Sequence, residues 1–188
     1  KLNYPKLKVD LELVAQKDGK IISNKNDESL IANYKKDIEE EIKNYSTAKF
    51  GKYKKREVMV GALARMANLD TAKKSGLDYQ NPFHNNLAQA IEIFLYHEQA
   101  QELINQLLSG EIDSNIGVKP EPAPMTGGQG IGAIEAPRGG LYHEIHLNEK
   151  GIITYANIIT PTVQNLTSIE RSGNALLEQF KNESVEKK

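Results

Sequence analysis

The chain contains no cysteine among its 188 residues. Without thiols, the chain itself can form no disulfide bond, thiolate metal site, iron–sulfur ligation or cysteine nucleophile. It also lacks any apolar run close to the ~18 to 20 residues that a membrane-spanning helix needs. The first five residues, Lys1-Leu2-Asn3-Tyr4-Pro5, include neither an initiator methionine nor an apolar signal core. We therefore expect a trimmed piece of a protein that is not secreted.

Charge of one sign is also missing, since the net charge is -1 and the pI is about 6.5. This near balance provides no overall attraction to nucleic acid, to an anionic membrane or to an acidic substrate. The apolar fraction is 39% and the charged fraction 26%, as in ordinary globular proteins. The length predicts a single domain over residues 1–180, followed by a polar, flexible tail at 181–188.

Two hairpins are expected from alternating apolar and polar residues. Residues 8–13 alternate as a half-buried strand does, and the turn residues Asp18-Gly19 separate them from Ile21-Ile22. Farther along, residues 141–147 and 152–159 flank a polar turn that ends at Gly151. We therefore expect two small antiparallel hairpins.

Helices are expected where apolar residues recur every three or four positions. One stripe runs from residue 31 to 45, and residues 58–66 form a second apolar stretch. The clearest helix opens at Asn81-Pro82 and ends at Gly110, and we expect it to be central to the core. A last helix follows Pro161. The predicted fold class is α+β, mainly helical with two small hairpins.

Residues 111–133 shift to proline and glycine and predict a long irregular loop. The run Gly127-Gly128-Gln129-Gly130-Ile131-Gly132 could suggest a phosphate-binding loop. A phosphate loop feeds a helix N-terminus and usually carries a lysine and a serine or threonine, and none follows here. A loop of close approach, or a hinge, is therefore the better interpretation.

Other candidate chemistry has simpler explanations. His143 and His146 fall on opposite faces of the predicted strand, so a structural role is favoured over a two-histidine metal site. The basic, aromatic residues 49–56 favour a solvated loop or a partner contact over a nucleic-acid strip. Glu98 is expected at the edge of the core rather than inside it. No Gly-x-Ser-x-Gly elbow is present, so hydrolase chemistry has no support.

The segment Glu135-Ala136-Pro137-Arg138-Gly139-Gly140 is the most unusual in the chain. It places a charged pair next to a rigid proline and two glycines, between the predicted loop and a strand. Arginine presents a planar fork of five hydrogen-bond donors. The residues alone leave two alternatives open, namely a clamp for an anion or ligand and a structural ion pair.

These same residues begin a family resemblance. Residues 134–143, then Gly151-Ile152-Ile153 and residues 159–165, closely resemble the pattern of nickel–iron hydrogenase large subunits. Val60-Gly61-Ala62-Leu63-Ala64-Arg65 resembles the family's VGxLAR segment, and residues 81–92 resemble the next helix in soluble, cofactor-linked members. Four matches occur in the expected order.

The resemblance implies an enzyme that splits hydrogen at a nickel–iron centre held by four cysteines, whose iron also carries cyanide and carbon monoxide. Arg138 would donate to an iron-bound cyanide, lie near the open hydrogen site and act as the catalytic residue. Pro137 would pack against the diatomic ligands, and Thr162 would offer its hydroxyl to the other cyanide. Both cysteine pairs are absent, as is the family's upstream proton-transfer glutamate. We therefore expect this chain alone to bind no metal and to be inactive.

The resemblance also implies partners: a small iron–sulfur subunit, with further electron-acceptor subunits, in the cytoplasm and with no role for nucleic acid or membrane. The chain is expected to self-associate if surfaces that normally meet the rest of the enzyme are exposed. The alternatives are a cysteine-less homologue resembling the quinone-site subunit of respiratory complex I, and a structural or assembly module. Retention of Arg138, and of Thr162 and Asn165 after Pro161, favours the hydrogenase.

Overall fold

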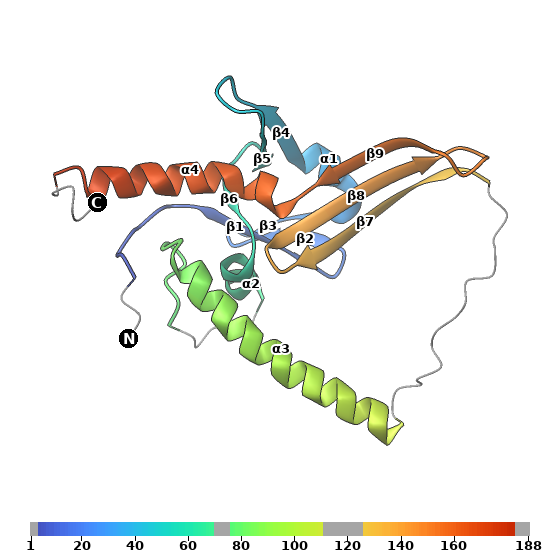
Figure 1. Ribbon diagram of the computed structural model, residues 1–188, viewed down its shortest axis with the longest axis horizontal. Helices are drawn as coiled ribbons and strands as arrows, with labels where there is room; N and C mark the ends of the chain where they lie inside the picture. Colours follow the sequence, from blue (N-terminus) through green and yellow to red (C-terminus); the bar gives the residue numbers. More distant parts are fainter. Residues whose placement is uncertain (1–3, 70–75, 111–125, 183–188) are drawn as a thin grey trace.

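The computed structural model describes residues 4–69, 76–110 and 126–182. Helices and strands are both abundant, and the strands form three separate sheets (Figure 1). The α+β class is therefore confirmed. However, strands occupy nearly as much of the described chain as helices, so the expected predominance of helix is not found.

The first predicted hairpin is present, with shifted bounds. Strand β1 (Glu12–Lys17) pairs antiparallel with β2 (Lys20–Ser23), and Asp18 and Gly19 have the positive φ angles of a tight turn. Strand β3 (Asp27–Leu30) extends this sheet on one side and β6 (Val58–Met59) on the other, giving the order β3-β2-β1-β6. Residues 8–11 are not in the strand, although Val9 and Leu11 are buried in the core.

The helix predicted from the stripe at residues 31–45 is wrong. A 3-10 turn η1 (Ile31–Asn33) and one turn of α1 (Tyr34–Asp37) lead directly into β4 (Ile38–Ile42), which pairs with β5 (Lys49–Tyr53). A spacing of four residues places side chains on one face of a strand as well as of a helix, so the period did not separate the two. The basic loop predicted at residues 49–56 is wrong for the same reason, because its first half is β5.

The apolar stretch at residues 58–66 divides into β6 and helix α2 (Ala62–Asn68). Gly61 separates them with a φ of 114°, a conformation that side-chain-bearing residues rarely adopt. Helix α2 lies in a buried apolar cluster with β1 and residues 7–11. A second cluster forms around the stacked rings of Tyr34 and Tyr142, whose centroids are 5.4 Å apart.

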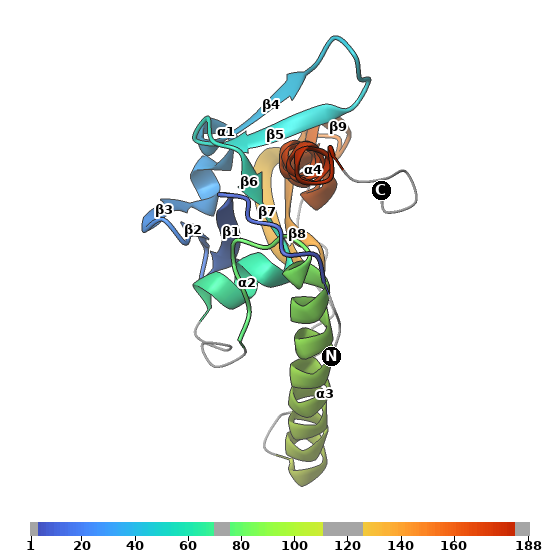
Figure 2. The ribbon, with the colours of Figure 1, turned by 90° about the vertical axis from the view of Figure 1, so that its left-hand side faces the viewer.

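Helix α3 (His84–Ser109) ends at Gly110 as predicted, with the left-handed cap at φ 77°. Its start is two residues later than expected, after Asn81 Oδ1 accepts a hydrogen bond from the Phe83 N–H. The helix is not central to the core. Only Ala88 and Glu92 are buried, and the helix runs away from the body of the molecule (Figure 2). Glu98 is exposed.

The second predicted hairpin is part of a larger sheet. Strand β7 (Gly128–Ala136) pairs with β8 (Gly139–Leu147), which pairs in turn with β9 (Ile153–Ile159). Residues 128–133 are therefore strand rather than irregular loop, and residues 111–125 lie outside the described part of the chain. The glycine-rich run feeds a strand and not a helix N-terminus, which removes the phosphate-loop alternative.

Helix α4 (Pro161–Gln179) begins where the sequence predicts. Thr160 caps it by accepting a hydrogen bond from the Val163 N–H, and Pro161 occupies the first helical position. The helix packs on β5, because Gly51 leaves room for the Gln164 backbone: a Cβ on Gly51 would lie 3.0 Å from the Gln164 Cα. The predicted tail lies mainly outside the described residues, so it stays a prediction. No helix of the described residues is long and apolar enough to cross a bilayer.

Candidate functional site

The tight turn between β7 and β8 carries the residues singled out in the sequence. The pairing of Ala136 with Gly139 leaves Pro137 and Arg138 at the tip. Gly139 has a φ of 129°, and a Cβ there would lie 2.3 Å from Val60 Cγ2. The turn is thus pressed against the end of β6, which only a glycine permits.

Pro137, Arg138 and Thr162 line one open cleft of about 730 Å³. The turn supplies one wall, the first turn of α4 supplies another, and α3 supplies a third. The remaining lining residues are Gln89, Glu92, Ile93, Tyr96, Ala136, Leu141, Thr160 and Pro161. Thr162 is 24 positions from Arg138, and the fold brings both to the same cavity.

The Arg138 side chain is exposed, and its guanidinium makes no hydrogen bond or ion pair with any other described residue. Only its backbone is held: the Asn165 Nδ2–H donates weakly to the Arg138 carbonyl at 3.5 Å, and Gly61 lies against the same oxygen. The structural ion pair between Glu135 and Arg138, one of the two sequence alternatives, is therefore not formed. Five donors are left facing a cleft.

Glu135 instead pairs with Arg65, at 2.8 Å between Nη1 and Oε1. Arg65 is buried in α2, and its Nε and Nη2 donate to the two carboxylate oxygens of Glu92, each at 2.6 Å. Burial disfavours the charge of Arg65, but the hydrogen bonds to Glu92 and Glu135 outweigh it and raise the pKa of the guanidinium. Burial also raises the pKa of Glu135, an effect that Arg65 and the Gln16 N–H partly offset.

Sequence reasoning missed this buried group. Arg65 belongs to the VGxLAR match but had no role assigned to it, and the carboxylate singled out on the helix was Glu98. Glu92 lies four residues after Ala88, and both are on the buried face of α3. A charged side chain on the inner face of a helix needs a partner, and that signal pointed to a buried cation elsewhere in the chain.

The other candidate residues have structural roles. His146 Nε2 lies 2.8 Å from Glu144 Oε1, and its ring packs on Tyr155 at 4.7 Å between centroids. In the described residues no group of three or more histidine, cysteine, aspartate or glutamate side chains could hold a metal. Within residues 49–56, the cations Lys49, Lys52, Lys54 and Arg56 pair with carboxylates of this same chain.

The residues of the cleft suit the surroundings of a metal group but not its ligation. The chain supplies no thiolate. It does supply a fork of five donors from Arg138 and a hydroxyl from Thr162, beside the apolar surfaces of Pro137, Ile93 and Leu141. Such a set fits charged acceptors carried by a group that other residues would have to anchor.

A sequence profile described as "Nickel-dependent hydrogenase" matches residues 15–177. Among curated proteins, the alpha subunit of sulfhydrogenase 1 from Pyrococcus furiosus is 36% identical over 166 residues, covering 82% of this chain and 37% of that protein. A large-chain relative from the F420-non-reducing hydrogenase of Methanothermobacter marburgensis is 31% identical, covering 74% of this chain and 32% of its own length. This chain therefore spans about a third of the length of these relatives.

The fold also matches a solved structure. A chain from the crystal structure of NAD+-reducing [NiFe]-hydrogenase in the H2-reduced state superposes with a TM-score of 0.69 at 20% sequence identity. The match covers 92% of this chain and 45% of the other. At this identity the likeness concerns the fold alone.

Proposed function

The chain belongs to the nickel-dependent hydrogenase family, and we propose that it forms the part of a hydrogenase large subunit that surrounds a nickel–iron centre. The observation that supports this function best is the convergence of Pro137, Arg138 and Thr162 on one cleft, with a guanidinium unpartnered among the described residues. The metals would be anchored by cysteines that this sequence does not contain. When bound, the centre supplies the site of heterolytic hydrogen splitting.

Each residue of the cleft has a distinct role in this proposal. Arg138 would donate hydrogen bonds to a cyanide on the iron and place a positive charge beside the hydrogen site. Thr162, in the first turn of α4, would donate its hydroxyl to the other cyanide. Pro137, Ile93 and Leu141 would present apolar surface that keeps water from the diatomic ligands.

The partners and location are part of the same proposal. Electrons would pass to a small iron–sulfur subunit, then onward to further acceptor subunits. This inference is supported by the likeness to relatives that are themselves named as hydrogenase subunits. The resemblance to soluble, cofactor-linked members supports a cytoplasmic enzyme. We expect residues 1–180 to act as one domain of the large subunit.

The test uses the intact subunit that contains this sequence, assembled with its metals. Replacing the arginine by lysine (R138K) keeps a charge but removes the planar fork, and we expect kcat for hydrogen oxidation to fall on the order of 100-fold. T162V should shift an infrared band of the iron-bound cyanides. R171K, at an exposed pair with Glu57, is the matched control. Wild-type rates and bands in both R138K and T162V would refute the assignment.

Two simpler measurements bear on the metal. Metal analysis of this chain alone should find no stoichiometric nickel or iron, because it has no thiolate ligands. Sequencing the gene around the coding region should find Cys-x-x-Cys pairs on both sides. Stoichiometric nickel in the chain alone would contradict the proposal, as would a gene without those cysteines.

A further inference from the structure

Arg65 uses all five of its guanidinium N–H donors, and two of the five bonds go to backbone. Three bonds go to the carboxylates of Glu92 and Glu135. The other two go to the carbonyl oxygens of Ala136 and Pro137, each at 2.8 Å. A residue needed only to neutralise buried carboxylates would not require these backbone bonds, so their location matters.

The two carbonyls belong to the peptide units immediately before Arg138. The Pro137 carbonyl is part of the peptide bond to Arg138 itself, so its direction limits where the Arg138 side chain can point. Arg65 is 4% exposed, and its planar fork holds both carbonyls in one fixed geometry. The bonds therefore fix the backbone from which the unpartnered guanidinium projects.

The far side of the turn is held by packing rather than by charge. Gly139 lies directly on Val60, and the Arg138 carbonyl lies against Gly61. Asn165 bridges this region, accepting from the Val60 N–H at 2.8 Å and donating to the Val60 carbonyl at 3.2 Å. Arg65 thus supplies the one charged restraint among the described contacts of the turn.

We propose that Arg65 is a positioning residue for Arg138. By holding the Ala136 and Pro137 carbonyls, it aims the Arg138 guanidinium into the cleft. The role of Arg138 itself rests on the function proposed above. Glu92 and Glu135 complete the device: they come from α3 and β7, so the aim of Arg138 depends on three elements meeting at one buried cation.

Lysine at position 65 tests this inference in the assembled subunit. Its single ammonium has three donors and cannot span two carboxylates and two carbonyls. We expect R65K to lower kcat on the order of 100-fold through misplacement of Arg138. R65K should also shift the infrared bands of the iron-bound cyanides in the same direction as R138K. The double variant R65K/R138K should shift them no farther than R138K alone.

The control separates positioning from stability. Leu13 is fully buried in β1, away from the cleft, and L13A should lower the melting temperature while leaving the cyanide bands unchanged. A melting temperature lowered by R65K with wild-type bands would overturn the inference. Shifts that add in the double variant would overturn it as well.

Two further arms keep the outcome decisive. If R65K does not assemble, E135Q weakens one of the Arg65 bonds with little change in volume and should shift the bands in the same direction; unchanged bands would overturn the inference. If R138K itself leaves bands and rate unchanged, the proposed function of Arg138 fails together with the inference. An effect in R138K without one in R65K or E135Q refutes the positioning role alone.

Discussion

Arg65 is surrounded by two carboxylates, so removing its charge leaves buried negative charge without compensation. We expect R65M to lower the free energy of unfolding of the chain by about 3–5 kcal/mol at neutral pH. Urea denaturation followed by circular dichroism measures this loss. The matched control is R171M, whose partner Glu57 is exposed, and we expect it to cost less than ~1 kcal/mol. Equal costs for the two variants would contradict the buried network.

Glu144 provides the pH dependence at this scale. Hydrogen bonds from Lys35, Tyr34 and His146 lower the pKa of this carboxyl from its ordinary value near 4.5 to about 2. A carboxyl whose pKa is lowered by folding contributes stability that is complete above pH 4.5 and is lost as the pH falls toward 2. The chain should therefore lose stability on acidification across this range.

The measurement compares urea unfolding of wild type and E144Q at pH 7 and pH 3. The loss of stability between the two conditions should be smaller in E144Q, because the amide does not titrate. E149Q, in the exposed turn before Gly151, should retain the wild-type loss. An identical loss in all three proteins would rule out Glu144 as a source of the acid sensitivity.

Single residues also show what the sequence could reveal about the site. Arg138, Pro137 and Thr162 were identified because they sit in motifs that resemble a family pattern, and the fold places them on one cleft. Arg65 had no role predicted, since its two carboxylate partners lie 27 and 70 positions away. A long-range ion pair has no local spacing by which it could be recognised. Whether the cleft residues act as proposed stays a prediction.

At the scale of elements, local chemistry predicted helix ends better than it predicted element type. Asn81, Pro82 and Gly110 bound α3 to within two residues, and Thr160-Pro161 begin α4, because caps depend on neighbouring residues alone. Residues 38–42 were wrongly expected to be helical. Their strand depends on pairing with β5, where Lys49 and Lys52 meet Glu40 and Glu41, and pairing partners are a tertiary property.

The turn between β7 and β8 gives a prediction for an element. G139A forces a side chain into a φ of 129° and a Cβ to 2.3 Å from Val60, so we expect a loss of about 2–4 kcal/mol in the free energy of unfolding. A Cβ at Gly132, on β7, would have nothing within 4 Å, and G132A should be neutral or slightly stabilising. Thermal or urea denaturation distinguishes them. A G139A protein as stable as G132A would show that the turn does not press on Val60.

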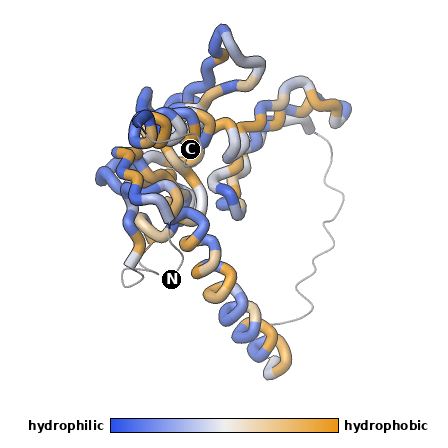
Figure 3. The backbone as a smooth tube through the Cα atoms, turned by 60° about the vertical axis from the view of Figure 1, so that its left-hand side comes forward, coloured by the Kyte–Doolittle hydropathy of each residue, from blue (hydrophilic) through white to orange (hydrophobic). Residues whose placement is uncertain are grey.

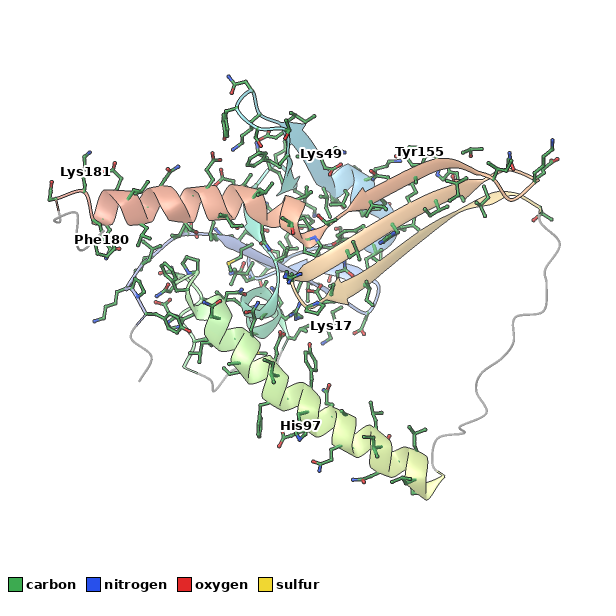
Figure 4. All side chains as sticks on the ribbon, viewed as in Figure 1. Lys17, Lys49, His97, Tyr155, Phe180 and Lys181 are labelled. Atoms are coloured by element: carbon green, nitrogen blue, oxygen red, sulfur yellow. The ribbon has the colours of Figure 1, made fainter. Side chains whose placement is uncertain are left out.

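At the scale of the whole molecule, the apolar residues of α3 are the main departure from what the sequence predicts. The stripe was expected to lie in the core, but most of the helix has no neighbouring element among the described residues (Figure 2). Apolar segments recur along its length (Figure 3), and side chains around His97 project outward (Figure 4). Periodicity identified a face that needs covering and could not identify what covers it, since this chain spans about a third of its relatives.

An uncovered apolar face of this size predicts that the chain alone associates with itself. Ile93 is 72% exposed and Leu108 82% exposed, and between them lie further exposed residues: Phe94, Tyr96, Leu103, Ile104 and Leu107. Pairing two copies through α3 would remove this area from water, at about 25 cal/mol per Å². Sedimentation equilibrium should therefore show a mass that rises with protein concentration.

Two matched variants locate the contact on this helix. Placing two glutamates on the apolar face, in I104E/L108E, should shift the chain toward monomer, because charge is costly to bury in an interface. Q99E/Q101E adds the same charge at exposed polar positions of α3 and should associate as wild type does. A chain that stays monomeric at every concentration would contradict the prediction. Equal association of both variants would place the contact on another surface, so that the exposure of α3 would have no bearing on assembly.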